Sequence, residues 1–411
     1  MATITESAEE VVLDITKRHA YVGGSAERNG VGRWSIIHDR PPAQSLPAGH
    51  SVHRLSRNTH EIDPHFLLQL LKKADENKFS RAIHAGDDPF VSFDVHPDRV
   101  VTECNEDGFS TGDIIALCAM SGSTKRPVDR SIGAHIGLSP VFDAAWKIHF
   151  QTSSFSFAFE NKRGTPGSGT LTPILGGSSE GISGYFTRMT LFLHENSDTG
   201  DPTRLQDALS RQVADLQHTC LLFLKNIKEI QVSLYDEAGL LVDCKIHRLE
   251  SLVGHIATLE TASIEPQGAK VESRHYHVTR HLATGLATSN KGGMTGDSAS
   301  SSESEVVLTF PLTEDSGPVV EPQHVFNFFP AKQYGFTFII HADFDTNAGE
   351  QDVITVSCRN VGLLGAIAST FVKAVLQMCG HSTEGDTRAL LPVQSYAAEG
   401  FGIAGPPVAY L

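Results

Sequence analysis

Four polar side chains in the first third of the chain could do acid/base chemistry. Gln69 and Lys73 belong to the stretch FLLQLLKKADENKF, in which a helix would place them one turn apart on the same face. Glu106 belongs to the stretch NEDGF, and His135 to the stretch IGAHIGLSPVF. Together they offer hydrogen-bond donors and one acid/base pair, which are the groups that a cofactor-independent isomerase, cyclase or lyase needs.

Helices and strands of the first half would position these side chains. Apolar residues recur at helical spacing in IDPHFLLQLLKKADENKF, which predicts a helix. Alternation in PFVSFDV and RVVTEC predicts two strands joined by the turn HPD, and KIHFQTSSFSFAFE predicts a second strand pair. A short helix at TGDIIALCAMS and a polar, glycine-containing lid at 122–137 are expected between the two pairs. This order predicts an α+β fold, an α/β sandwich with helices on one face of a mixed sheet.

A second α/β unit is expected to begin near Gly184, after the linker GGSSEGISG. GYFTRMTLFLHE predicts a strand, TRLQDALSRQVADLQHTCLLFLKNI predicts one long helix, and KEIQVSLYDEAGLLVDCKIHRLES predicts a hairpin that turns at 236–239. Further strands are expected in SEVVLTFPL and GFTFIIHADF. A last helix is expected in LLGAIASTFVKAVLQMC.

The length of 411 residues predicts two or three domains. We expect an N-terminal extension at 1–50, a first domain at 51–175, a second domain at 185–385 and a C-terminal tail at 386–411. Residues 285–304 are small and polar and can bury almost nothing, so we expect a disordered loop there. The tail is apolar but rich in proline and glycine, so we expect it to pack on the body in extended form.

The charge balance argues against two classes of partner. The 48 acidic and 33 basic residues give a formal charge of -15, and a negative field disfavours phosphate backbones and anionic membranes. We therefore expect neither nucleic acid nor a membrane as a partner. The N-terminus lacks the basic and apolar parts of a signal peptide, and the six cysteines form no CxxC pair, which indicates free thiols in the cytoplasm.

No metal site is predicted. His275, His277 and His281 lie close together in RHYHVTRH. No carboxylate or cysteine nearby completes a ligand set, so we expect these histidines to be solvated.

Three stretches together resemble the ATP-binding motifs of the GHKL, or Bergerat-fold, superfamily. They are LSRNTHEIDPHFLLQLLKKADENKF, CNEDGFSTGDIIALCAMSGSTK and SIGAHIGLSPVF, in the family's order and approximate spacing. The resemblance is closest to the branch with sacsin and the NO VEIN proteins of plants and fungi, relatives of the ninety-kilodalton heat-shock chaperones. LLFLKNIKEIQVSL and FNFFPAKQYGFTFIIHADF look like that branch's middle region. The resemblance implies a Bergerat-type domain followed by a middle-type α/β domain.

The first motif departs from the family at its two chemical positions. The family pattern is roughly ELIQNADDN, in which the glutamate activates water and the asparagine holds magnesium. The matching residues here are Gln69 and Lys73. An amide cannot accept the proton, and an ammonium opposes a metal ion, although Lys73 could neutralise a phosphate directly. Alternatively, both residues lie on the solvent face of an ordinary helix.

The second motif is better preserved, and the third is not. By resemblance Glu106 binds the adenine amino group, although a plain strand–helix turn would use the same residues. The third motif is one residue shorter than the family pattern IGEKGIGFKSVF, and Pro140 offers no amide to a phosphate. In the middle region Glu350 stands near the position of a family arginine. If nucleotide binding is retained, the cofactor-binding residues are Asn105, Glu106, Gly108, Thr124, Lys125, Gly133 and Gly137.

Three functions stay open from the sequence. In the first, the chain has lost ATP hydrolysis and uses the former nucleotide site for another small molecule, with Lys73, His135, Gln69 and Glu106 as candidate catalytic residues and no cofactor. Burial against Leu70 and Phe90 would then lower the pKa of Lys73. The second is a pseudo-ATPase scaffold that binds ATP, ADP or protein partners without turnover, and the third is an active ATPase with unusual residues. A homodimer is compatible with each of them.

Overall fold

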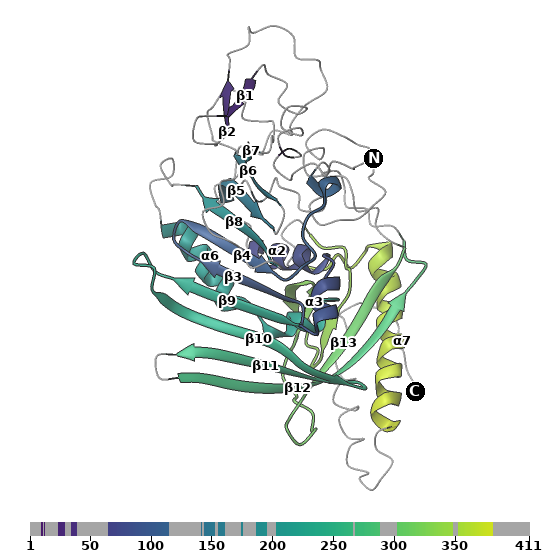
Figure 1. Cartoon of the computed structure of the whole chain (residues 1–411). Helices are drawn as coiled ribbons and strands as arrows, with labels where there is room; N and C mark the ends of the chain where they lie inside the picture. The colour runs from purple at the N-terminus through teal and green to yellow at the C-terminus, as the bar shows by residue number, and fades with distance from the viewer. Residues whose placement is uncertain are drawn as a thin grey trace. The chain divides into compact units, whose positions relative to one another are not determined.

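The structure is a computed structural model that describes the residues coloured in Figure 1. They are residues 10, 12, 24–28, 34–38, 65–114, 141, 144–152, 155–160, 174–175, 186–194, 203–265, 268–287, 302–347 and 352–380. The chain divides into two compact units. Unit 1 comprises Met1–Leu216, Leu224–Ile246 and Ser263–Lys270, and unit 2 comprises Gln217–Phe223, His247–Ala262 and Val271–Leu411.

Unit 1 is built on a mixed sheet. Its strand order is β9 (Glu229–Tyr235), β3 (Phe90–Val95), β4 (Arg99–Cys104), β8 (Thr187–Leu193), β5 (Ala145–Gln151), β6 (Ser156–Glu160) and β7 (Ile174–Leu175). β3 and β9 run parallel, whereas β4, β8, β5, β6 and β7 pair antiparallel with their neighbours. The two predicted strand pairs, β3–β4 and β5–β6, are confirmed. A separate hairpin is formed by β1 (Gly24–Arg28) and β2 (Trp34–His38).

Three helices of unit 1 are needed to describe the candidate site. They are α2 (Phe66–Asp75), α3 (Ser80–Ala85) and α6 (Thr203–Asp215). The predicted helical spacing in α2 is confirmed, because Phe66, Leu67, Leu70 and Leu71 are buried together. The amide of Leu67 donates to Oε1 of Gln212 at 3.0 Å, which ties α2 to α6.

The predicted long helix at 203–227 is wrong. α6 ends at Asp215, Gln217 is extended, and a 3-10 turn, η2 (His218–Leu222), follows. Beyond η2, the amides of Lys225, Asn226 and Ile227 donate to the carboxylate of Asp75. Since a helix would have to use those amides internally, this contact replaces the last turns of the predicted helix.

Unit 2 carries longer strands. The order is β15 (Phe329–Gln333), β14 (His324–Asn327), β16 (Ile339–His341), β13 (Ser304–Leu312), β12 (Gly268–Ala283), β11 (Ile256–Glu265) and β10 (Leu241–Val253). β14 and β16 run parallel, and β13 pairs antiparallel with β12 and with β16. The predicted hairpin that turns at 236–239 is the pair β9–β10. β10, β11 and β12 each begin in one unit and end in the other.

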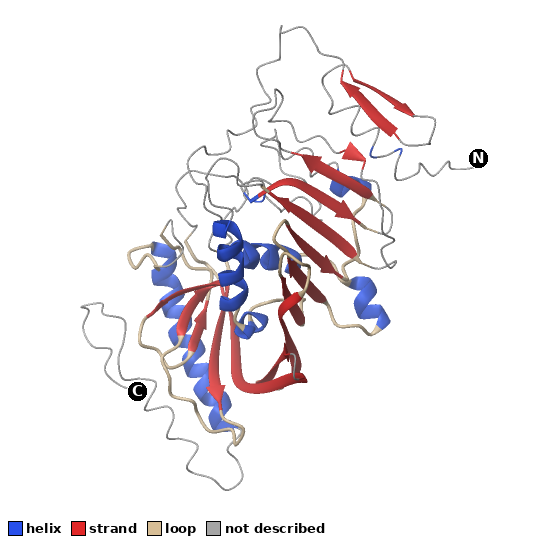
Figure 2. Cartoon of the chain, turned by 90° about the vertical axis from the view of Figure 1, so that its left-hand side faces the viewer, coloured by secondary structure: helices blue, strands red, loops and turns tan. Residues whose placement is uncertain are grey.

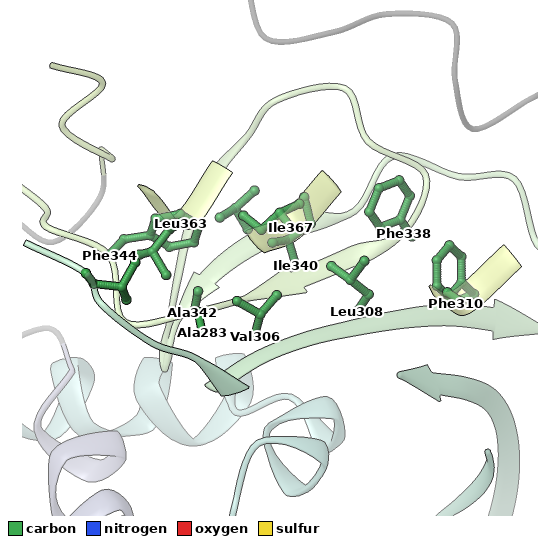
Figure 3. Packing of buried hydrophobic residues seen from close by; sticks show 13 residues of the cluster. Ala283, Val306, Leu308, Phe310, Phe338, Ile340, Ala342, Phe344, Leu363 and Ile367 are labelled. Carbon is green, nitrogen blue, oxygen red and sulfur yellow. The ribbon is translucent and has the colours of Figure 1, made fainter. Parts of the chain in front are cut away.

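The core of unit 2 lies between its sheet and the helix α7 (Cys358–Gly380), which packs along β13 (Figures 1 and 2). Leu363 and Ile367 of α7 meet Leu308 and Phe310 of β13 and Ile340 of β16 in one apolar cluster (Figure 3). α7 starts five residues earlier than the predicted last helix.

The two units divide the chain differently from the domain ranges expected at 51–175 and 185–385. β8, α6 and β9 belong to unit 1 although they follow Gly184. The reason is pairing: β8 lies between β4 and β5, so the sheet of unit 1 needs it. Most of the expected loop at 285–304 and all of the tail at 386–411 lie outside the described residues.

Candidate functional site

Glu106 is the most deeply buried carboxylate of the predicted site. It follows β4 in the turn NEDGF and is only 2% exposed. The side-chain amide of Asn77, which lies between α2 and α3, donates to Oε2 of Glu106. Thr187, at the start of β8 and opposite Cys104 of β4, adds a hydroxyl beside the carboxyl group. Glu106, Asn77 and Thr187, together with Thr152 after β5, are called the Glu106 group below.

Burial raises the pKa of Glu106 to about 8. The nearby hydroxyl of Thr187 and the hydrogen bond from Asn77 oppose this rise, and the charges of Asp107 and Asp113 add to it. Glu106 is therefore mostly protonated at neutral pH. A neutral carboxylic acid can donate one hydrogen bond and accept others, and a pKa close to neutrality suits proton transfer.

The turn that carries Glu106 needs glycine at position 108. Gly108 has a φ of +82°, which favours glycine. A Cβ there would also lie 2.5 Å from Oγ1 of Thr152, which is far too close. The motif glycine therefore lets the turn approach β5 closely.

The residues around Glu106 in the motif have structural tasks. Asn105 accepts from the amide of Phe90 and donates to the carbonyl oxygen of Asp88, both at 2.9 Å, and so holds the start of β3. Asp107 accepts from the amide of Arg81 at 2.9 Å and caps the first turn of α3. Asn105 and Asp107 thus accept hydrogen bonds from backbone amides, whereas the carboxyl group of Glu106 accepts from the side chain of Asn77.

Gln69 and Lys73 lie one turn apart on α2. Both are half-buried, and Nζ of Lys73 is 3.4 Å from Oε2 of Glu76 in an ion pair. The side chain of Lys73 is 35% exposed, so it is only partly buried. Its catalytic role and the solvent-face alternative both stay predictions.

Several predicted site residues lie outside the described residues. These are His135 and the glycine-rich lid, with Thr124, Lys125, Gly133 and Gly137, and also Glu350 of the middle region. Their roles stay predictions.

Sequence reasoning missed the role of Asp75. Its carboxylate accepts from the amides of Lys225, Asn226 and Ile227 at 2.8–2.9 Å, and its carbonyl oxygen accepts from the side chain of Asn226 at 2.7 Å. Consecutive amides that converge on one carboxylate form an anion nest, here filled by the protein itself. Asp75 therefore fixes the segment 225–227 against the end of α2, and Asn77 bonds to Glu106.

The described residues do not fit a magnesium ion at the expected position. Lys73 carries an ammonium group, which repels a divalent cation, and Gln69 has no carboxylate to offer. Within the described ranges no cluster of three or more His, Cys, Asp or Glu side chains could hold a metal ion.

The expectation of solvated histidines is wrong for His277, which is buried on β12 and bonds to Oγ1 of Thr279. The neighbouring His275, half-buried, shares a hydrogen bond with Thr258 at 3.1 Å. These rings are thus part of the packing of unit 2.

The sequence is similar to the protein NO VEIN of Arabidopsis thaliana. The two are 26% identical over 351 residues, which cover 82% of this chain and 12% of that protein. The chain therefore spans about an eighth of the length of this relative. No protein-family model matches the chain.

Three solved structures show limited likeness. They are the B-subunit of the DNA gyrase from Myxococcus xanthus (10% identity, TM-score 0.29, 49% of this chain and 61% of that chain), the N-terminal domain of a DNA repair protein (11%, 0.33, 76% and 96%) and the ATPase domain of the mismatch repair endonuclease MutL from Aquifex aeolicus (11%, 0.32, 74% and 97%). The chain itself has an α+β fold with a large mixed sheet.

Proposed function

We propose that this chain has a GHKL-type fold, does not hydrolyse ATP, and binds a small molecule at the Glu106 group. One observation carries the proposal: the buried, hydrogen-bonded Glu106 is kept, whereas Gln69 and Lys73 stand where the base and the metal ligand would be. The similarity to NO VEIN, which covers 82% of the chain, supports the assignment of the fold.

The proposed loss of hydrolysis follows from the chemistry of α2. The side-chain amide of Gln69 has no basic site that could take a proton from water. The ammonium group of Lys73 repels a divalent cation and is already paired with Glu76. Neither step of metal-assisted hydrolysis has a group to perform it on the described part of this helix.

The buried acceptor atoms of the site that receive no described hydrogen bond indicate which groups a ligand should carry. Oδ1 of Asn77 and Oδ1 of Asp113 are buried acceptors to which no described group donates. Asp113 otherwise accepts from the amide and hydroxyl of Ser110, both at 2.7 Å. A ligand that completes this set brings N–H or O–H donors, as the amino edge of a purine or pyrimidine does. ATP or ADP bound without hydrolysis meets this requirement through adenine.

A further part of the proposal is that the protein converts the bound molecule into a product. Glu106 is better suited than Lys73 to transfer a proton near neutral pH, because burial has brought its pKa to about 8. His135 on the lid is the proposed second group. An isomerase, cyclase or lyase of this kind needs no cofactor.

ATP hydrolysis tests the first half of the proposal. The purified protein is expected to release phosphate from ATP no faster than buffer alone, with or without magnesium. The double substitution Gln69→Glu and Lys73→Asn restores the base and the metal ligand. It is expected to give less than full family activity, because the third motif stays one residue short.

Lys72→Asn in place of Lys73→Asn is the matched control, since it removes a neighbouring charge from the same helix. A magnesium-dependent rate in the wild-type protein that Glu106→Gln abolishes would overturn the proposal.

A further inference from the structure

The first part of β12 extends beyond its neighbour β13. β13 pairs with β12 as far as His275, which lies opposite Leu312, whereas β12 begins at Gly268. Residues 268–274, GAKVESR, are all exposed, and on their other side β12 lies next to β11. These residues, called the β12 edge below, therefore lie at an edge of the sheet.

At every second residue, the backbone groups of the β12 edge point away from β11. The amide of Val278 donates to the carbonyl oxygen of His255, the residue before β11, at 2.7 Å. The backbone groups of a strand point alternately to its two sides, so even-numbered residues of β12 bond toward β11. The groups that point to the other side include the amides of Ala269, Val271 and Ser273. Among the described strands, none pairs with that side of these three residues.

Side-chain contacts between β11 and β12 keep one register up to the β12 edge. Thr258 and His275 share a hydrogen bond at 3.1 Å, and the hydroxyl of Ser273 donates to Oε1 of Glu260 at 3.3 Å. Both pairs have the register of the amide bond from Val278. The alternation of backbone groups therefore continues into the β12 edge.

The side chains of the β12 edge are complementary to the same edge of a second copy. In an antiparallel pair centred on Val271, Lys270 of each copy lies opposite Glu272 of the other copy, so a two-fold axis creates this pair twice. On the other face Val271, which is 58% exposed, lies opposite Val271 of the other copy. Pairs of opposite charges and of β-branched residues stabilise antiparallel strands.

The charges of the β12 edge disfavour the neighbouring registers. A shift by two residues in one direction places Glu272 opposite Glu272, and a shift in the other direction places Lys270 opposite Lys270. A parallel pair in register has both of these contacts. Like charges directly opposite each other destabilise two paired strands. The antiparallel pair centred on Val271 is thus the register that the sequence selects.

We propose that the β12 edge pairs antiparallel with the β12 edge of a second copy, so that the chain forms a weak homodimer. A lone lysine on an edge strand commonly prevents such pairing. Here Glu272, two residues away on the same face, gives Lys270 a partner in the second copy. The outward backbone groups of Ala269, Val271 and Ser273 form about six hydrogen bonds across the axis.

The size of the contact sets the strength of the proposed dimer. The β12 edge is about 24 Å long at about 3.4 Å per residue, so the contact is smaller than the interface of a permanent dimer. The dissociation constant is therefore expected to lie between about 1 µM and about 1 mM.

Sedimentation equilibrium of the full chain at about 1 µM to about 1 mM tests this inference. Lys270→Glu and Glu272→Lys, made singly, place like charges opposite each other and are each expected to weaken the dimer at least about tenfold. The double substitution exchanges the two charges, so it is expected to return the dissociation constant to within about threefold of the wild-type value. An equimolar mixture of the two single variants is expected to form a mixed dimer for the same reason.

Lys332→Glu is the matched control, because it makes the same change of charge at an exposed lysine of β15, the strand at the end of the sheet. It is expected to leave the dissociation constant unchanged. A wild-type chain that stays monomeric up to about 1 mM overturns the inference. So does a dimer that the single substitutions leave intact, or one that the exchange of the two charges fails to restore.

Discussion

Replacing Asp75 by asparagine is expected to lower the free energy of unfolding of unit 1 by about 3 to 5 kcal/mol, because it leaves buried amides without a charged acceptor. Three amides, those of Lys225, Asn226 and Ile227, point at this carboxylate. An asparagine keeps the volume but turns an NH₂ group toward at least one of these donors. Urea unfolding monitored by circular dichroism measures the loss.

Glu76→Gln is the matched control for Asp75→Asn. Glu76 is the next residue in the chain, but its carboxylate is 40% exposed and pairs with Lys73 at the surface. Its replacement is expected to change stability by less than about 1 kcal/mol. Equal effects of the two substitutions would contradict the role assigned to Asp75.

The second large effect concerns pH and Glu106. The pKa of Glu106 is about 8 in the folded chain, against 4.5 for an unperturbed glutamate, so the folded state keeps a proton that the unfolded state has lost between these values. The resulting stability is complete below pH 4.5 and is lost as the pH rises through about 8. The shift corresponds to at most about 5 kcal/mol.

Glu106→Gln is expected to remove this pH dependence, since glutamine does not ionise, while its one amide oxygen can still accept from Asn77. Melting temperatures measured from about pH 6.5 to about pH 8.5, above the range in which His218 contributes, should fall in the wild-type protein and stay level in the variant. A wild-type curve that rises between pH 6 and pH 8.5 would contradict the buried, protonated state of Glu106.

His218 of unit 2 gives the stability the opposite pH dependence to that from Glu106. Burial, with the charges of Arg274 and His247, lowers the pKa of His218 to about 4, and the ring bonds to the hydroxyl of Tyr276 at 2.7 Å. Stability from this neutral histidine is present above pH 6.5 and is lost as the pH falls through about 4. His218 therefore contributes a loss of stability in acid, whereas Glu106 contributes a loss of stability in alkali.

Local patterns in the sequence were sufficient to predict some elements. Alternating apolar residues predicted β3–β4 and β5–β6, and the spacing of Phe66 and Leu70 predicted α2, because each pattern is complete within a few turns or strands. The same reasoning predicted a helix through 225–227. It failed there because the acceptor of those amides, Asp75, lies 150 residues earlier in the chain.

The sequence predicted only part of the candidate site, because contacts between residues far apart in the chain leave no local pattern. The turn NEDGF is local, so Glu106 and Gly108 could be found from the sequence. The partner amide of Asn77 is 29 residues away, and the short distance to Thr152 depends on how β5 packs. The role of Lys73 stays a prediction, since its side chain is partly buried and pairs with Glu76.

A thermal-shift comparison of small heterocycles tests the central claim most directly. Adenine, adenosine, ADP and 2-aminopyrimidine all carry an amino group, and purine and pyrimidine are their counterparts without one. The account predicts that at least one amino-bearing compound raises the melting temperature of the wild-type and Lys73→Ala proteins but not of Glu106→Gln, while the counterparts without the amino group have no effect. If the same compounds stabilise Glu106→Gln equally, or if none stabilises any of the three proteins, the Glu106 group is a structural feature and the proposed site is wrong.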